Sequence, residues 1–449
     1  MESIRSNRHP KLLVVSRSEW SDENSVGSTL TNFFGDWPID DIANLSFRAG
    51  RPNNNVCHKY FLLTEVGLIK GNGEYEIAAY EEACFSVSTN CDASFEKKDR
   101  KSSAVEKKLV ELFRGKSIYI VNILQSFFWM LGWWKRRSLY RFLRKFDVDV
   151  IFFPAFHAPY THLVIRHIAK LTGAKLIIFH ADDYLCKDVS EFGFFKRYYW
   201  NWSKREILNS IGMADLNYCI TDLQATEYHK KTGSVFSVLH KGASVADEKK
   251  STRNNEYSQP GQLRMVYAGS LEHGRWKTVK LLSKAVEKLN EKGAKIHLDI
   301  FSQYSISEEV RCGIESKGAS SFHGAISSSE LKNVVASSDI VLHVESFDPV
   351  DMQDVKFSFS TKIVDCLASG TCLMAVGPEG VASIEYLKET RAAIVVDSPE
   401  DIGDAIFGCY SDRNYLVGVR NKAREYCERY IDISQVRSRL YLDIFDVLK

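Results

Sequence analysis

Short apolar runs alternate with stretches of helical periodicity along most of the 449-residue chain. Such alternation is typical of βαβ units that build a parallel sheet. The pattern occurs twice, so the sequence predicts an α/β protein with two Rossmann-like halves. Strands are predicted at residues 12–15, 150–153, 176–179, 216–220 and 235–239 in the first half, and at 264–268, 295–301, 340–344, 372–376 and 392–396 in the second.

A polar, turn-forming segment separates the two halves. Residues 246–261 contain charged side chains, asparagines and a Pro-Gly pair, a composition typical of linkers. We therefore expect one domain over residues 1–245 and another over 262–425. A long helical pattern follows, and we expect its last part, about 426–449, to pack back onto the first domain.

Composition excludes several classes of protein. The 59 basic and 57 acidic residues give a formal charge of +2, which argues against a nucleic-acid-binding protein that neutralises many phosphates. The ten cysteines form no C-x-x-C pair and indicate reduced thiols in a cytosolic protein.

The polar residues 1–10 offer no secretory signal, so a cytoplasmic location is expected. The apolar stretch 118–134 contains Asn122, Gln125 and Ser126, which argues against a membrane-spanning helix.

The second half begins with a strand that ends in a glycine-containing loop. Gly269 and Ser270 follow the strand, and Arg275 and Lys277 precede a helix. Backbone N–H groups and cations placed in this way can bind a phosphate. A plain β-α turn with solvated basic residues has the same pattern.

A second constellation precedes the apolar run 372–376. Hydroxyl residues including Ser360 and Thr361 come before Lys362 at the start of a short predicted helix, and Asp365 lies one turn further on. A helix N-terminus beside a lysine suits a diphosphate, and a carboxylate in this place can accept hydrogen bonds from ribose hydroxyls. The alternative is that the hydroxyls cap the helix and Asp365 complements its dipole.

Five landmarks occur in a fixed order between residues 264 and 407: the glycine loop, residues 322–326, residues 338–343, residues 360–370 and residues 397–402. This order resembles the nucleotide-sugar domain of the retaining GT-B glycosyltransferases, the glycosyltransferase family four group. The resemblance implies GT-B architecture, with two Rossmann-like domains facing each other across a cleft and a donor site in the second.

The resemblance also implies roles for individual residues. The diphosphate would lie near the glycine loop and the 360–362 segment, the base near Gly324 and Ile326, and the ribose at Asp365. It favours catalysis without a metal or other cofactor, because Arg275 and Lys362 can neutralise the leaving diphosphate. The predicted donor-binding residues are Gly27, Gly269, Ser270, Arg275, Lys277, Gly324, Ile326, Ser360, Thr361, Lys362 and Asp365.

One position departs from the family pattern. The family carries two glutamates with seven residues between them; Asp365 takes the second position, and Phe357 stands at the first. Glu345, in the loop after the predicted strand 340–344, is the acid that could substitute in catalysis. A solvated loop residue is the alternative for Glu345, and the sequence favours that alternative.

The first half offers further candidates at predicted strand ends. Gly27 opens a helix after the first strand, and His180 and Asp182 follow the strand at 176–179. Ligands in open α/β sheets lie beyond the carboxyl ends of the strands, so His180 could stabilise the transferring sugar and Asp182 could act as a general base. The alternatives are a core histidine for His180 and a helix cap or metal ligand for Asp182.

Aromatic and basic residues are interleaved in residues 127–137 and 192–202. Such helices can lie in a membrane interface, with the basic groups on anionic headgroups. A helix that packs its rings on the sheet and exposes its arginines is the alternative.

We therefore expect a cytoplasmic glycosyltransferase, at or near the inner face of the membrane. It would transfer a hexosyl group from a UDP- or GDP-type donor to a glycan or lipid-linked acceptor, with retention, in polysaccharide biosynthesis. A nucleotide-sugar epimerase and a catalytically silent GT-B binding protein remain alternatives. An NAD-dependent oxidoreductase is excluded, because residues 15–20 contain no glycine for the G-x-G-x-x-G loop.

Overall fold

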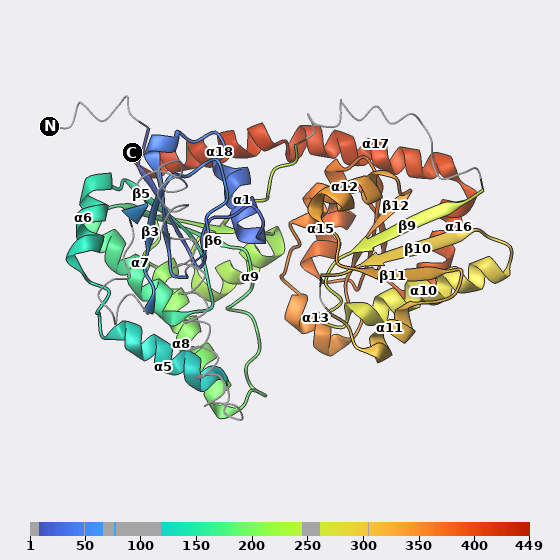
Figure 1. Ribbon diagram of the computed structural model, residues 1–449, viewed down its shortest axis with the longest axis horizontal. Helices are drawn as coiled ribbons and strands as arrows, with labels where there is room; N and C mark the ends of the chain where they lie inside the picture. The colour runs from blue at the N-terminus through green and yellow to red at the C-terminus, as the bar shows by residue number, and fades with distance from the viewer. Residues whose placement is uncertain (1–8, 49, 66–75, 78–117, 245–260, 304) are drawn as a thin grey trace, which may run out of the picture. The chain divides into compact units, whose positions relative to one another are not determined.

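The chain divides into two compact units, each with its own parallel sheet (Figure 1). The first unit comprises residues 1–239 and 437–449, and the second comprises residues 240–436. The predicted linker, apart from Gly261, lies outside the described residues. The computed structural model describes residues 9–48, 50–65, 76–77, 118–244, 261–303 and 305–449.

The first unit contains an eight-stranded sheet in the order β4-β3-β2-β1-β5-β6-β7-β8. All neighbouring strands run parallel except β3 and β4. The order reverses between β1 and β5, as expected for a doubly wound sheet. The strands are β1 (Leu12–Ser16), β2 (Ile42–Ser46), β3 (Lys59–Leu62), β4 (Glu76–Ile77), β5 (Val150–Pro154), β6 (Lys175–His180), β7 (Leu216–Cys219) and β8 (Ser237–Val238).

Helices cover both faces of this sheet, because successive strand residues point to opposite sides. Phe153 packs in a core cluster with residues of α5, α6 and α7, whereas Phe152 contacts the ring of Phe33 on α1. The helical elements are α1 (Ser25–Phe34), the 3₁₀ turn η2 (Ile39–Asp41), α5 (Ile118–Met130), α6 (Arg137–Phe146), α7 (Pro159–Thr172), α8 (Phe194–Ile211), α9 (Asp222–Thr232) and α18 (Ile433–Val447), whose residues from 437 onward belong here.

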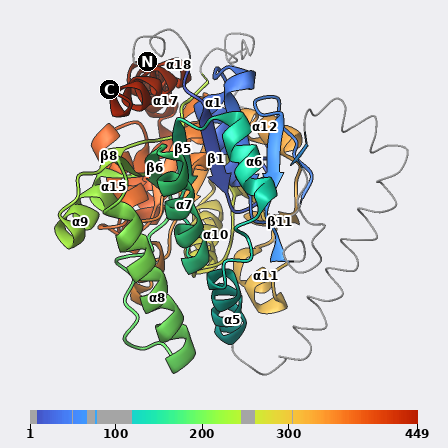
Figure 2. The same cartoon turned by 90° about the vertical axis from the view of Figure 1, so that its left-hand side faces the viewer.

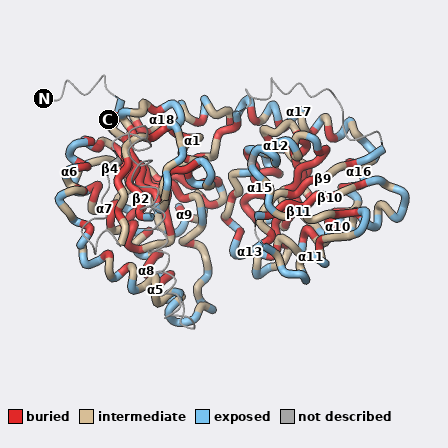
Figure 3. The backbone as a smooth tube through the Cα atoms, in the orientation of Figure 1, coloured by how far each residue is buried: buried red, intermediate tan, exposed pale blue. Residues whose placement is uncertain are grey.

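The second unit contains a six-stranded, entirely parallel sheet in the order β11-β10-β9-β12-β13-β14. Apart from the edge strand β11, the strands are mostly buried and form the red interior of the unit in Figure 3. The order reverses between β9 and β12. The strands are β9 (Leu263–Ala268), β10 (Ile296–Phe301), β11 (Ser320–Gly324), β12 (Ile340–Val344), β13 (Cys372–Val376) and β14 (Ile394–Val396).

Helices α10 and α16 bury their apolar residues against one face of the second sheet, together with Met265 and Leu342 of the strands. A 3₁₀ turn, η4 (Pro399–Asp401), precedes α16. The helices of this unit are α10 (Arg275–Glu291), α11 (Glu308–Ile314), α12 (Ser328–Ala336), α13 (Pro349–Val355), α14 (Lys362–Ala368), α15 (Ala382–Thr390), α16 (Ile402–Ser411) and α17 (Arg413–Tyr430).

All ten predicted strands are present, and the sequence analysis missed four others. Polar residues conceal β2 and β11: Asn44, buried within β2, donates hydrogen bonds to Val14 O at 3.0 Å and Ser16 Oγ at 2.9 Å, and β11 lies at an edge of its sheet. A buried polar residue is tolerated when it is hydrogen-bonded, but it interrupts the apolar run that marks a strand. The strands β3 and β4, of four and two residues, were also missed.

The long C-terminal helical pattern forms two helices, α17 and α18. The break falls at residues 431–432, where the chain pairs with Ala243: Ala243 N donates to Ile431 O, and Ile433 N donates to Ala243 O. In α18, Arg437 Nε donates to Asn32 O at 2.7 Å and Arg437 Nη1 lies 2.7 Å from Asp36 Oδ1. The last part of the chain thus belongs to the first unit.

None of the eight cysteines among the described residues forms a disulfide. Five are buried in the two cores, and burial raises the pKa of Cys57 to about 12. Within the described part of the chain, no helix has the length and apolarity needed to cross a bilayer.

Candidate functional site

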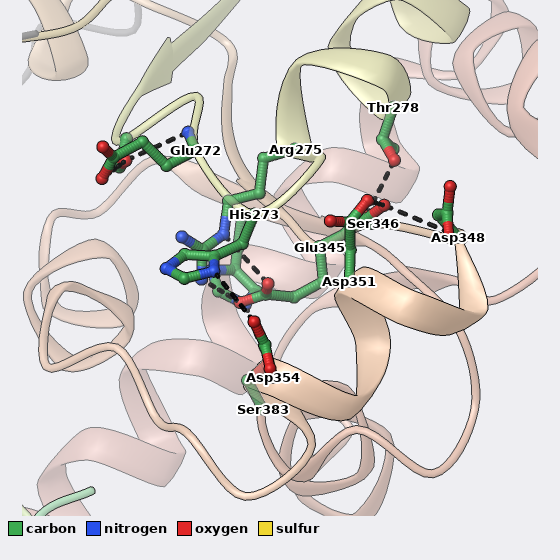
Figure 4. Close-up of polar contacts among 12 residues, drawn as sticks. Glu272, His273, Arg275, Thr278, Glu345, Ser346, Asp348, Asp351, Asp354 and Ser383 are labelled. Carbon is green, nitrogen blue, oxygen red and sulfur yellow. Dashed lines mark hydrogen bonds and ion pairs between the residues drawn. The ribbon is translucent and has the colours of Figure 1, made fainter. Parts of the chain in front are cut away.

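The point where the strand order reverses in the second unit brings two loops together. In open α/β sheets, ligands bind beyond the carboxyl ends of the strands at such a point. Here the loop after β9 leads into α10, and the loop after β12 leads into α13. Figure 4 shows that side chains of the two loops point toward one another.

The backbone of the first loop takes a left-handed turn just before α10. His273 has φ of 51° and Gly274 has φ of 67°. A Cβ on Gly274 would lie 1.9 Å from Asp351 Oδ2, so the position requires glycine both for its conformation and for space. The turn ends in Arg275, the first residue of α10.

Arg275 and Glu345 form a two-pronged ion pair between these loops (Figure 4). Arg275 Nε donates to Glu345 Oε2 at 2.9 Å, and Nη2 donates to Oε1 at 3.1 Å. The Glu345 side chain is 2% exposed, so the expectation of a solvated loop residue was wrong. Burial by itself lowers the pKa of Arg275, but the adjacent carboxylate outweighs it, and the pKa is raised. The planar guanidinium can donate two parallel N–H hydrogen bonds to the two oxygens of one carboxylate, which is the arrangement seen here.

Neighbouring polar groups enclose Glu345. Its backbone carbonyl accepts a hydrogen bond from Thr278 Oγ1 at 2.8 Å, and His343 Nε2 lies 3.5 Å from Glu345 Oε1. His343 Nε2 also lies 3.0 Å from Ser383 Oγ. Burial lowers the pKa of His343, so this ring is neutral at pH 7.

Lys277 on α10 and His273 in the first loop also lie beside acids. Lys277 Nζ lies 2.7 Å from Asp348 Oδ2 and 3.1 Å from Asp351 Oδ2. His273 Nδ1 lies 3.9 Å from Asp354 Oδ2. The predicted phosphate-binding cations are therefore balanced by carboxylates here, and an incoming diphosphate would compete with those carboxylates. The spacing of the three aspartates along 348–354 could have revealed this acidic face in the sequence.

The second predicted constellation forms the short helix α14. Thr361 occupies the N-cap position but makes no side-chain capping hydrogen bond, while the carbonyl of Ser360 accepts from Ile363 N at 2.9 Å. Lys362 is exposed in the first turn. The alternative in which hydroxyls cap this helix is therefore not observed for Thr361.

Asp365 lies in the first turn of α14 with its side chain 55% exposed. Lys241 Nζ donates to both carboxylate oxygens, at 2.7 and 2.9 Å. The Lys241 side chain is only 14% exposed, and the sequence analysis missed it. A single lysine between β8 and the predicted linker carries no pattern that identifies it.

The remaining predicted donor residues of this unit lie at the ends of strands. Gly269 N donates to Phe301 O at 3.1 Å, and Ser270 Oγ accepts from Glu272 N at 3.2 Å. Gly324 ends β11 with φ of 76°, and a Cβ there would meet nothing within 4 Å. Ile326 is half-buried in the loop that follows.

Phe357, which stands where the family pattern has a glutamate, is 7% exposed. Its position between α13 and α14 makes it a packing residue. Position 357 therefore carries no acid. Glu345, the acid that could substitute for it in catalysis, forms an ion pair with Arg275.

Gly27, predicted to bind donor from the first unit, has a packing role. Its N–H donates to the N-cap residue Asn24 at 2.7 Å. A Cβ on Gly27 would lie 2.0 Å from Ser21 O. Both the N–H and the space in front of Cα are thus occupied by the turn that precedes α1.

His180 ends β6 and is completely buried. Its ring centroid lies 5.4 Å from that of Tyr228 and 5.9 Å from that of Phe236. Burial lowers the pKa of His180 to about 4, against a smaller opposite effect of Asn217. This environment favours the core-histidine alternative over a catalytic role.

Asp182 is exposed in the loop after β6. Its Oδ2 accepts a hydrogen bond from Tyr184 OH at 3.1 Å, and its carbonyl accepts from Gln224 Nε2 at 3.0 Å. Its neighbour Asp183 accepts from Leu185 N at 3.0 Å in the same turn. Asp182 is therefore accessible to solvent on a loop held by α9.

Comparison with solved structures shows the type of fold. The chain is similar to HepE from Anabaena in complex with UDP (TM-score 0.59, 11% identity, 97% of this chain and 100% of that chain). It is also similar to trehalose 6-phosphate synthase from Burkholderia multivorans (0.59, 12%, 98% and 99%) and to WaaG, a glycosyltransferase involved in lipopolysaccharide biosynthesis (0.56, 10%, 96% and 99%). These similarities establish a GT-B fold of two parallel-sheet α/β domains.

A search of curated protein sequences found no significant match. Residues 262–412 match the family model of glycosyl transferases group 1. The matched range contains both loops at the β9/β12 reversal and all of α14. On a chain with the GT-B fold, the second unit therefore carries a domain of the glycosyl transferases group 1 family.

Proposed function

We propose that this protein transfers a hexosyl group from a UDP- or GDP-linked donor to a glycan or lipid-linked acceptor in the cytoplasm. The carrying observation is the convergence of Arg275, Glu345 and Lys277 at the strand-order reversal, inside the range that matches the glycosyltransferase model. The similar structure of HepE holds UDP, which supports a uridine nucleotide as the first ligand to test.

The diphosphate group of the donor would bind at the first loop. Arg275 and Lys277 are now paired with carboxylates, so the phosphates would displace acids or draw the cations away from them. The exchange weakens donor binding, but the freed cations would then stabilise the negative charge that grows on the leaving diphosphate in the transition state. Because these cations and Lys362 can neutralise that charge, the proposal includes transfer without a metal.

The ribose would bind at Asp365. A carboxylate can accept hydrogen bonds from two vicinal hydroxyls, and the 55% exposed side chain is accessible to them. Lys241 acts as a positioning residue, because its ammonium holds both carboxylate oxygens. The two hydrogen bonds fix the direction in which the remaining lone pairs point.

Binding of UDP and GDP by calorimetry tests this proposal. Asp365→Ala should weaken binding by about 1.5 to 3 kcal/mol, as for hydrogen bonds to a charged group. The ratio of affinities for UDP and 2′-deoxy-UDP should fall toward one in this variant, and part of the way in Lys241→Met. The exposed Glu389→Ala on α15 makes the same change in charge and should leave the ratio unaltered.

Transfer is tested separately from binding. Lys362→Ala should depress turnover more than affinity, because the charge it neutralises increases as the glycosidic bond breaks. Donor hydrolysis followed by NMR reports the anomer formed first and thus tests retention, and parallel reactions with EDTA test independence of metal. Tight UDP binding with no hydrolysis and no transfer would instead support a silent binding protein, which the buried Phe357 favours.

A further inference from the structure

Apolar side chains are exposed on two neighbouring helices of the first unit, α5 and α8. In Figure 1 and Figure 2 both helices extend to the same end of that unit, where they contact each other and α7. The exposed residues of this α5/α8 surface, between 45% and 76% accessible, are Ile118, Leu124, Phe127, Met130, Leu131, Trp133, Phe194, Phe195 and Tyr198.

These exposed residues follow helical spacing, while the rings on the opposite sides are buried. On α5, Leu124 and Phe127 are exposed, whereas Trp129 is completely buried in the core. On α8, Phe194 and Tyr198 are exposed, whereas Trp200, on another side of the helix, is 8% exposed. Each helix thus has apolar side chains on two sides: one side packs in the core, and the other presents apolar rings to solvent.

The α5/α8 surface is continuous across the seam between the helices. The ring of Trp202 lies 5.1 Å from that of Phe127 and 6.2 Å from that of Tyr198. A pocket opens at this seam, and its lining includes Phe127, Met130, Tyr198 and Arg205. Apolar side chains and a cation therefore meet at one opening.

Positive charge is concentrated in the same two segments. Residues 118–146 contain six basic residues and no acid, and α8 contains four basic residues and one acid, although the whole chain has a formal charge of only +2. The single acid, Glu206, pairs with Arg166 at 2.5 Å and is 13% exposed. The basic residues beside this surface are those of α8 and residues 135–137, which follow α5; α5 itself carries no charge, and the other three basic residues of 118–146 lie further along α6.

We infer that the α5/α8 surface docks on an anionic lipid bilayer. Aromatic rings suit the boundary between headgroups and acyl chains, and lysine and arginine at the rim attract acidic headgroups. The same charge disfavours a second copy of this chain as the occupant, because two such surfaces would repel each other. A lipid-linked acceptor would then reach the enzyme in the plane of the bilayer, a consequence that rests on the proposed function.

Vesicle co-sedimentation of the intact protein tests the inference without any measurement of activity. Binding is expected to vesicles with about 30% phosphatidylglycerol and not to pure phosphatidylcholine, and it should weaken at high salt. Replacing Arg136 and Arg137 by glutamate should weaken partition by roughly thirtyfold or more, since each basic residue near the surface contributes about fivefold. Phe127→Ser with Phe194→Ser should also weaken partition.

A matched control reverses two exposed lysines on α10 of the second unit. Lys284→Glu with Lys288→Glu makes the same change in total charge and should leave partition unchanged. Trp133 supplies a direct probe, because it is 51% exposed: lipids with brominated chains should quench tryptophan emission, and Trp133→Phe should remove most of that quenching.

Three outcomes would overturn the inference. The first is failure to sediment with anionic vesicles at low salt. The second is equal loss of partition in the control on α10, which would mean that total charge alone decides. The third is a stable dimer in light scattering that the Phe127 and Phe194 substitutions dissociate, because a second copy would then cover the surface.

Discussion

The two units share one plan of strands but place their polar side chains differently. In the second unit, charged groups gather at the strand-order reversal and meet as ion pairs, such as Arg275 with Glu345. In the first unit, His180 at the end of β6 is a buried neutral ring beside Tyr228, and the acids Asp182 and Asp183 that follow it accept hydrogen bonds from a hydroxyl and a backbone N–H and form no ion pair among the interactions described here. A doubly wound sheet thus supplies the same geometry for two kinds of chemistry.

The match to the glycosyl transferases group 1 model falls on residues 262–412, in the unit where the charged groups gather. The comparison also predicts that the two units respond differently to pH, to loss of charge and to ligand.

The largest expected effect is acid destabilisation of the first unit. Burial lowers the pKa of His157 and His162 to about 3 and that of His180 to about 4, from 6.5. Above pH 6.5 neither state binds these protons; as pH falls toward the folded values, only the unfolded state binds them, and stability is lost. Between pH 7 and 5 the loss should be roughly 2 kcal/mol per histidine, on the order of 5 kcal/mol in all.

Urea unfolding followed by tryptophan fluorescence at both pH values measures this loss, and limited proteolysis locates it. His180→Leu should recover about a third of it, because the substituted side chain cannot be protonated. An equal loss of unfolding free energy between pH 7 and 5 in wild type and variant would show that His180 does not contribute to the acid destabilisation. Retained transfer activity in the same variant would also exclude His180 from the chemistry.

The second effect concerns the buried ion pair of the second unit. Arg275→Met leaves the Glu345 carboxylate buried without its partner, and unfolding free energy should fall by about 3 to 5 kcal/mol. The double variant Arg275→Met with Glu345→Leu should recover most of this loss, because no buried charge remains. Thermal unfolding of the four proteins in the cycle measures the coupling; additive losses would mean that the pair is not coupled.

A third, somewhat smaller effect is stabilisation by ligand. UDP or GDP at 100 times its dissociation constant should stabilise the protein by about 2.7 kcal/mol. Hydrogen exchange should slow in residues 269–277 and 358–370 of the second unit. Protection confined to residues before 240 would place the nucleotide in the other unit and reverse the comparison.

The smallest effect is expected for Lys277→Ala. Lys277 Nζ pairs with Asp348 and Asp351, but its side chain is 45% exposed, and solvent screens such pairs. The melting temperature should therefore stay within experimental error, whereas UDP affinity should fall. A clear loss of stability would show that Lys277 holds the two loops together in the absence of ligand.

Strand positions were predictable wherever buried runs are wholly apolar. Residues 340–344 and 372–376 match β12 and β13 to the residue, because central parallel strands are buried on both faces. Polar strands gave no such signal: the side-chain N–H groups of Asn44, inside β2, find acceptors on β1, and those partners are visible only in three dimensions.

For the site, the residue types were predictable and their partners were not. Arg275 and Asp365 were identified from their places beside predicted strands and helices, yet Glu345 and Lys241, which hold them, come from distant segments. Burial of a charged residue depends on finding an opposite charge across the fold. Local periodicity contains no information on that partner, and for this reason Glu345 was expected in solvent.

The split of the first unit has a consequence for biosynthesis. Its helix α18 packs Tyr441 against Trp37 at 4.9 Å and joins Asp443 to Tyr218, but residues 240–436 of the second unit are translated first. At about 5 to 20 residues per second, the ribosome needs roughly 10 to 40 s for that interval. During this time the nascent first unit lacks its last helix, with Trp37 uncovered, while the second unit can already fold. The first unit is thus completed only after the second has been translated, and the contacts of α18 to Trp37 and Tyr218 form last.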